Sequence, residues 1–186
     1  MIPSQDAAKI LWDKYTLPEK KRAHSALVSR VALMLAQELT KKGISVNADL
    51  LVVAALLHDI DKALPKLPGE GHPGGAVRVL TDEGMDEVAQ LVKTHSLHTI
   101  IDPALAPKSW EEKILYLADK MVKLEVVGVD GRFALWRAES LPPSAAATLN
   151  ACYPKVKELE KEIADILGLT PEEMTKRATD AILKKE

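Results

Sequence analysis

An unbroken apolar run that ends in a histidine and an aspartate is the feature that most constrains this chain. Residues 50–57 (LLVVAALL) are apolar throughout, and His58 and Asp59 follow directly. The run must be buried to contribute to a core, and burying an imidazole and a carboxylate at its end is unfavourable by several kcal/mol unless something compensates them. A metal ion is the simplest compensation, because it binds neutral imidazole and carboxylate together.

Composition and charge narrow the class of protein. The 186 residues suffice for a single domain spanning 1–186, and 47% of them are hydrophobic. A net charge of −2, from 25 basic and 27 acidic residues, gives no electrostatic signature of bulk nucleic-acid or membrane binding. Cys152 is the only cysteine, so no internal disulfide forms. The first residues do not resemble a signal peptide, and the apolar run is too short to cross a bilayer. We therefore expect a soluble, cytoplasmic protein.

The spacing of apolar residues predicts an all-α fold without a convincing strand. The second expected helix ends at a Lys-Lys-Gly sequence, the third begins at Asn47 and ends at Leu64-Pro65, and a capping-box pattern begins another helix at Ser109. Residues 128–131 are expected to form a turn, and Pro154 to kink or break the helix that contains it. The expected helices are residues 4–15, 18–42, 47–64, 75–81, 85–95, 109–127, 132–139, 144–168 and 170 onward.

Histidines and aspartates recur on the predicted buried faces of these helices. His24 lies one turn before Val28 on an apolar stripe, His95 continues the stripe of residues 88–92, and Asp119 has apolar neighbours on both sides. A single histidine on such a face is usually a hydrogen-bonded core residue. The five histidines all precede residue 99, however, and together with Asp59 and Asp119 they predict a metal site built from several helices. Imidazole and carboxylate ligands suit Mn, Fe, Zn, Ni or Co.

The order of these residues resembles that of HD-domain metal-dependent phosphohydrolases. The family signature is a helix-borne histidine, an adjacent His-Asp pair after an apolar helix, and a distant aspartate. Here these are His24, the pair in AALLHDIDK, and the aspartate in YLADK. The resemblance covers about residues 15–140. It implies a compact all-α bundle in which His24, His58, Asp59 and Asp119 hold a divalent metal, and it leaves residues 144–186 as accessory helices.

A subset of the family binds a second metal through two further histidines, with the aspartate of the His-Asp pair bridging both ions. The sequences GEGHPGGA and KTHSLHTI stand where those ligands belong, so the resemblance implies His72 and His95 as ligands, with His98 as the substitute for His95. The layout is most similar to bacterial HD proteins that hydrolyse dinucleoside tetraphosphates. It resembles HD-GYP cyclic-dinucleotide phosphodiesterases more loosely, because the Gly-Tyr-Pro triplet is missing.

One position departs from the family pattern. Many relatives have glycine in the sequence His-Asp-Ile-Gly-Lys, whereas this chain has Asp61. Its carboxylate could bind water, pair with Lys62 or be solvated, and we expect solvation. Lys62 keeps the family position, where it could neutralise a phosphate oxygen or be a surface lysine at a helix end.

The expected function is hydrolysis of a phosphoester or phosphoanhydride, in a nucleotide or dinucleoside polyphosphate, by a metal-activated hydroxide. One or two ions of Fe, Mn, Co, Ni or Zn, with Mg also possible, would serve as cofactor. Asp59 and Lys62 are the expected catalytic residues. The candidate substrate-binding residues are Lys62, His98, Arg132 and Arg78.

Two other functions and two assembly states stay open at this point. The alternatives to hydrolysis are a catalytically silent HD-type nucleotide-binding regulatory module and a di-iron oxygenase on the same fold. The apolar seam of residues 156–166 could pack against its own domain or form a dimer, so the expected state is a monomer or a homodimer.

Overall fold

The computed structural model describes residues 2–183, and these form nine α-helices and one 3₁₀ helix. No strand forms among them; Val122 and Val126 make an isolated bridge. The predicted all-α fold is confirmed. The helices are α1 (Gln5–Lys14), α2 (Glu19–Lys41), α3 (Ala48–Leu57), α4 (Gly74–Asp82), α5 (Asp86–Lys93), the 3₁₀ helix η1 (Leu97–Ile101), α6 (Trp110–Met121), α7 (Gly128–Arg137), α8 (Pro143–Leu167) and α9 (Pro171–Leu183).

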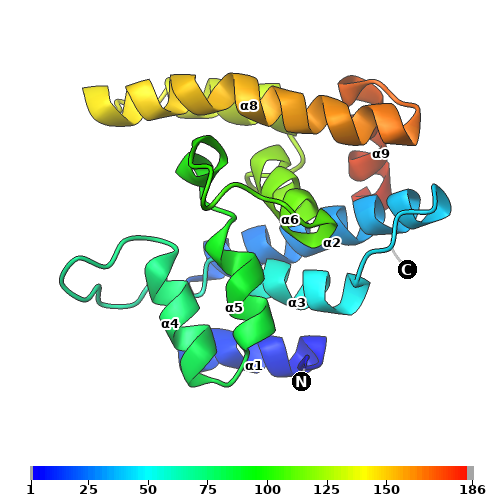
Figure 1. Ribbon diagram of the computed structural model, residues 1–186. Coiled ribbons are helices and arrows are strands. Elements are labelled where there is room, and N and C mark those ends of the chain that lie inside the picture. The colour runs from blue at the N-terminus through cyan, green and yellow to red at the C-terminus, as the bar shows by residue number, and fades with distance from the viewer. Residues whose placement is uncertain (1, 184–186) are drawn as a thin grey trace.

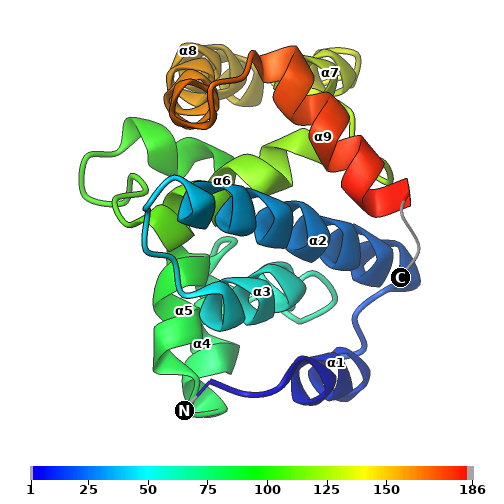
Figure 2. The ribbon, with the colours of Figure 1, turned by 90° about the vertical axis from the view of Figure 1, so that its right-hand side faces the viewer.

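Helices α2, α3 and α6 form the centre of the molecule. The long α2 packs against both α3 and α6, and α3 also contacts α1 and α5. Helices α7 and α8 cover one side of this centre, while α1 and α4 lie on the opposite side (Figures 1 and 2). Helix α9 packs against α2, so the end of the described chain returns to the central layer.

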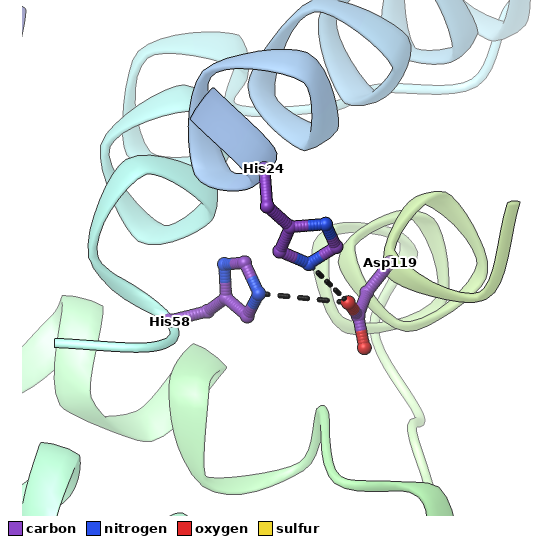
Figure 3. Close-up of side chains that lie close together, drawn as sticks. All are labelled: His24, His58 and Asp119. Atoms are coloured by element: carbon purple, nitrogen blue, oxygen red, sulfur yellow. Dashed lines mark hydrogen bonds and ion pairs between the residues drawn. The ribbon is translucent and has the colours of Figure 1, made fainter. Parts of the chain in front are cut away.

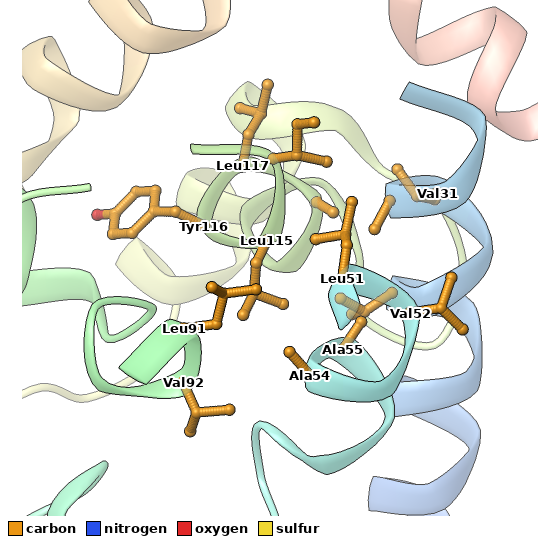
Figure 4. Packing of buried hydrophobic residues seen from close by; sticks show 14 of the residues in the cluster. Val31, Leu51, Val52, Ala54, Ala55, Leu91, Val92, Leu115, Tyr116 and Leu117 are labelled. Carbon is orange, nitrogen blue, oxygen red and sulfur yellow. The ribbon is translucent and has the colours of Figure 1, made fainter. Parts of the chain in front are cut away.

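The apolar run of the sequence forms the middle of the core. All eight residues from Leu50 to Leu57 are buried, and their side chains meet those of α2, α5 and α6 (Figure 4). A helix that is apolar on every side is stable only when neighbours surround it. The position of α3 between α1, α2, α5 and α6 meets that requirement.

Side-chain caps begin the helices where the sequence predicts them. Ser4 accepts a hydrogen bond from the Ala7 amide at 3.1 Å, and Asn47 accepts one from the Leu50 amide at 3.1 Å. Ser109 and Glu112 form a complete capping box at the start of α6. These bonds satisfy amide groups that have no partner inside the helix.

Helix ends were predicted less well than helix starts. Helix α3 ends at Leu57 rather than at Leu64, and α6 ends at Met121 rather than near residue 127. Residues 128–131 form the first turn of α7, and α8 continues through Pro154 without a break. The proline removes one hydrogen bond to the Asn150 carbonyl, but the apolar seam on either side of it still packs.

Of the helices in residues 2–183, none combines sufficient length with sufficient apolar character to cross a bilayer.

Candidate metal centre

Three helices bring His24, His58 and Asp119 together in the interior. His24 comes from the second turn of α2, His58 follows the last residue of α3, and Asp119 lies near the end of α6 (Figure 3). Asp119 Oδ1 is 2.9 Å from His24 Nε2 and 3.5 Å from His58 Nε2. Both histidines are buried, and the ligand atoms of the three residues lie close enough together to hold one metal ion.

A second group shares His58 and extends the site toward α5. It consists of His58, Asp59 and His95, all buried, and its ligand atoms are again close enough to hold an ion. His95 lies two residues beyond α5, so the helix ends before it, but its side chain still points into the core. His58 Nε2 is 3.9 Å from Asp59 Oδ2.

His72 reaches the same region from the Pro/Gly-rich loop that precedes α4. Its Nε2 atom is 2.9 Å from His95 Nε2 and 3.5 Å from Asp59 Oδ1. The six residues predicted as metal ligands therefore form one continuous cluster. His24, His58 and Asp119 occupy one end, and His72 and His95 occupy the other, with Asp59 between His58 and His72.

Backbone carbonyl groups at or near helix ends orient three of the four clustered histidines. His58 Nδ1 donates to the Ala55 carbonyl at 2.7 Å, and His95 Nδ1 donates to the Val92 carbonyl at 2.6 Å. His24 Nδ1 donates to the carbonyl of Lys123, just past the end of α6, at 2.9 Å. The last carbonyls of a helix have no partner within it, so they are available for such bonds. The early ends of α3 and α6 thus have a direct effect on the site.

These hydrogen bonds fix the tautomer of each ring. A carbonyl oxygen can only accept, so the proton must lie on Nδ1, and the neutral ring then presents a lone pair at Nε2. Nε2 is the nitrogen of His24, His58, His72 and His95 that faces the cluster. His58 Nε2 is fully buried and has no hydrogen-bond partner among the described residues. Inward-facing lone pairs beside carboxylates are the donor set that a transition metal requires, so the residues fit an ion.

The electrostatics keep the two carboxylates ionised. Burial opposes ionisation of Asp59, but the positive charges of His58, Lys62 and Lys21 outweigh burial and lower its pKa. Burial also opposes protonation of His58, yet the two carboxylates raise the pKa of its ring, so a bound ion would take the place of the His58 Nε2 proton. Burial likewise opposes ionisation of Asp119, and the adjacent Lys120 with the two histidines lowers its pKa well below the ordinary value. Burial, reinforced by nearby cations, lowers the pKa of His95, so that this ring is neutral at neutral pH. Ionised carboxylate and neutral imidazole are the forms that bind metal.

Lys120 and Lys21 contact the ligands directly, and sequence reasoning did not select either. Lys120 is 1% exposed, and its Nζ atom lies 2.6 Å from both the His95 carbonyl and Asp119 Oδ2. Lys21, one turn before His24 on α2, donates to Asp59 Oδ2 at 2.8 Å. Because lysine side chains are rarely buried, the residue type gives no reason to expect a lysine in contact with a buried metal ligand. The only sequence signals were adjacency to Asp119 and helical spacing from His24.

Replacing Lys120 by methionine should destabilise the metal-free protein by about 3 kcal/mol, because it leaves the buried Asp119 carboxylate without its cation. Methionine preserves the apolar stem of the side chain but removes the ammonium that lies 4.4 Å from the centre of the Tyr116 ring. Urea denaturation measures the change. The decrease in the free energy of unfolding should be smaller with metal bound, since the ion supplies positive charge to Asp119. Lys93→Met, on the exposed face of α5, is the matched control. Equal stability of the two variants would contradict this role.

Two of the predicted phosphate-binding groups lie near the carboxylates. Lys62 Nζ is 3.5 Å from Asp59 Oδ1. The Arg132 guanidinium of α7 stacks over the Trp136 ring at 4.2 Å, and its Nε and Nη1 atoms are buried without a hydrogen-bond partner among residues 2–183. Burial lowers the pKa of Arg132, whereas the carboxylates of Asp119, Glu139 and Asp59 act in the opposite direction. An arginine with unused donors facing anionic groups can bind an anion.

The other two predicted substrate-binding residues lie elsewhere. Arg78 forms a double hydrogen bond with Glu70, at 2.8 and 3.1 Å, and thereby ties the Pro/Gly-rich loop to α4. His98 is exposed on η1 and lies outside both metal-binding groups, so His95 is the histidine of that segment that enters the cluster. The expectation that Asp61 is solvated is wrong: Asp61 is buried and contacts His72.

Comparison with known proteins places the chain in a family. The sequence model described as HD domain matches residues 22–123, which is more than half of the chain. The chain belongs to the HD domain family. All six clustered histidines and aspartates fall inside the matched segment. Searches among curated proteins and among solved structures found no significant match. HD domains are typically metal-dependent phosphohydrolases, and the buried His/His/Asp group agrees with that chemistry.

Proposed function

We propose that this HD domain protein is a metal-dependent hydrolase of a phosphoanhydride or phosphoester bond in a nucleotide, with dinucleoside polyphosphates as the first substrates to test. One observation carries the proposal: four histidines turn their Nε2 atoms toward a largely buried cluster that also holds two ionised carboxylates. A hydrogen-bonded core alone does not explain His58 Nε2, which has no hydrogen-bond partner among the described residues. The match to the HD domain supports the reaction class.

The ligand groups support one ion and allow two. The first ion would take His24, His58, Asp59 and Asp119, and the second would take Asp59, His72 and His95. Mn, Fe, Co, Ni and Zn all suit this ligand set, and Mg is possible. Bound metal supplies an activated water and positive charge for phosphate oxygens.

Residues of this chain would hold and orient the phosphate. Lys62 and Lys21 both contact the Asp59 carboxylate, so an anion bound beside Asp59 would lie within reach of two ammonium groups. Arg132 would contribute its unused guanidinium donors from α7. Positioned cations of this kind stabilise the charge that develops during phosphoryl transfer. Asp59 and Lys62 are the catalytic residues of the proposal, one as shared ligand and the other as charge stabiliser.

A substrate panel with defined metals tests the proposal. Protein stripped with a chelator and reloaded with Mn, Fe, Co, Ni, Zn or Mg in turn would be mixed with mononucleotides, dinucleoside polyphosphates and cyclic dinucleotides. We expect metal-dependent turnover of at least one nucleotide, measured by chromatography of the products, and no turnover by the stripped protein. Tight nucleotide binding without turnover by any metal form would contradict hydrolysis and favour a regulatory module. Oxygen consumption by the iron form would favour an oxygenase.

A further inference from the structure

The residue that departs from the family pattern contacts a proposed metal ligand. Asp61 is 9% exposed, and its two carboxylate oxygens lie 2.9 and 3.1 Å from His72 Nδ1. Because an ionised carboxylate can only accept, His72 Nδ1 carries a proton, and its Nε2 atom faces His95 and Asp59. The expected alternative, a pair with Lys62, does not form, since Lys62 contacts Asp59 instead.

His72 needs such a partner more than the other histidines do. Carbonyl groups at or near helix ends orient His24, His58 and His95, but His72 lies in the Pro/Gly-rich loop just before α4, and its Nδ1 contacts the Asp61 carboxylate instead of a backbone carbonyl. A half-buried loop histidine without a bond at Nδ1 would sample several ring orientations. The Asp61 carboxylate therefore fixes the orientation of the His72 ring, as backbone carbonyls do for the rings of the other three histidines.

The start of α4 is shaped to admit the Asp61 side chain. A Cβ atom on Gly75 would lie 3.0 Å from Asp61 Cβ and 3.1 Å from Asp61 Oδ2, closer than packed atoms normally approach. Gly75 thus leaves room for the carboxylate against the first turn of α4. The N-terminal end of a helix is also a favourable place for negative charge. Asp61 lies against the first turn of α4 on one side and is bonded to His72 on the other.

We propose that Asp61 is a positioning residue that holds His72 with Nε2 toward the second ion, and that Gly75 provides the space it requires. The inference rests on the proposed function, because it assumes that the cluster binds two ions. Hydrogen bonds from a metal-bound histidine to a carboxylate commonly fix the ring and strengthen metal binding.

Metal titration of the full chain tests the inference. Asp61→Ala should weaken binding of the second Mn or Co ion by about 10- to 100-fold while affinity for the first ion stays unchanged. Asp61→Asn, whose amide oxygen still accepts from Nδ1, should retain most of the affinity. Gly75→Ala should weaken the second ion without altering any ligand. Asp180→Ala, which removes an exposed carboxylate from α9, is the control. Calorimetry with chelator competition gives both affinities.

Nitrogen NMR of the metal-free protein provides a readout that is independent of metal and activity. We expect a His72 Nδ1–H tautomer in the parent protein and in Asp61→Asn, and a mixture of tautomers in Asp61→Ala. If Asp61→Ala still binds two ions and still has the His72 Nδ1–H tautomer, the inference is overturned and the proposed function stays intact. A parent protein that binds one ion only would also overturn it. If the parent protein binds no ion at all, both the inference about Asp61 and the proposed function fail.

Discussion

Replacing Asp59 by alanine should lower the rate of nucleotide hydrolysis by about 1000-fold or more and remove bound metal. Asp59 lies 3.9 Å from His58 Nε2 and 3.5 Å from His72 Nε2, and the proposal makes it a ligand of both ions, so its loss affects either ion. Metal ions contribute several kcal/mol of transition-state stabilisation, and each 1.4 kcal/mol corresponds to a factor of ten in rate. Product chromatography and elemental analysis of the purified variant measure the two effects.

The fold should survive this substitution. In the metal-free protein Asp59 interacts with His58, Lys21 and Lys62. Both lysines can turn to solvent once the carboxylate is gone, so the circular dichroism spectrum should remain helical. Asp49→Ala, in the exposed first turn of α3, is the matched control and should keep both metal and activity. Full metal occupancy in Asp59→Ala would contradict the site assignment, even if activity were lost.

Replacing Leu51 by alanine should destabilise the protein by about 2–5 kcal/mol. Leu51 is fully buried in α3, where α2, α5 and α6 surround it, and its truncation leaves a cavity that close-packed neighbours fill only in part (Figure 4). For a domain of this size, a loss of that order lowers the melting temperature by roughly 4–20 °C. Thermal unfolding followed by circular dichroism measures the shift.

Ile10→Ala provides the contrast, because Ile10 is 66% exposed on α1 and its truncation should change stability by less than about 0.5 kcal/mol. Well below its melting temperature, Leu51→Ala should still bind metal, since Leu51 is not a ligand and lies two helical turns before His58. Equal stability of the two variants would contradict the central position of α3 in the core.

Helical periodicity made much of the fold and of the ligand set predictable. The spacing of apolar residues fixed the rotation of α2 and α6, and therefore turned His24 and Asp119 inward. The length and apolar character of residues 50–57 placed His58 and Asp59 at the buried end of α3. These are local properties, because 3.6 residues per turn determine which side chains share a face.

The helix ends could not be predicted in the same way. The structure ends α3 at Leu57 and α6 at Met121, and the irregular backbone that follows α6 offers the Lys123 carbonyl to His24. Nothing in the residues after Met121 forbids a helix; the bond that replaces it joins residues 99 positions apart. Local propensity is a weak determinant where a tertiary contact offers the backbone another partner.

The sequence by itself determined that this is a helical protein with histidines and aspartates on buried faces. It also carried, through the order of those residues, the resemblance to the HD domain. Only the tertiary structure decided which side chains support the ligands. Asp61 bonds to His72, Lys120 bridges Asp119 to the His95 carbonyl, and Lys21 reaches Asp59. From the sequence alone, each of these charged residues is expected to be exposed to solvent. Its buried partner can be identified only when the fold brings a distant segment of the chain beside it.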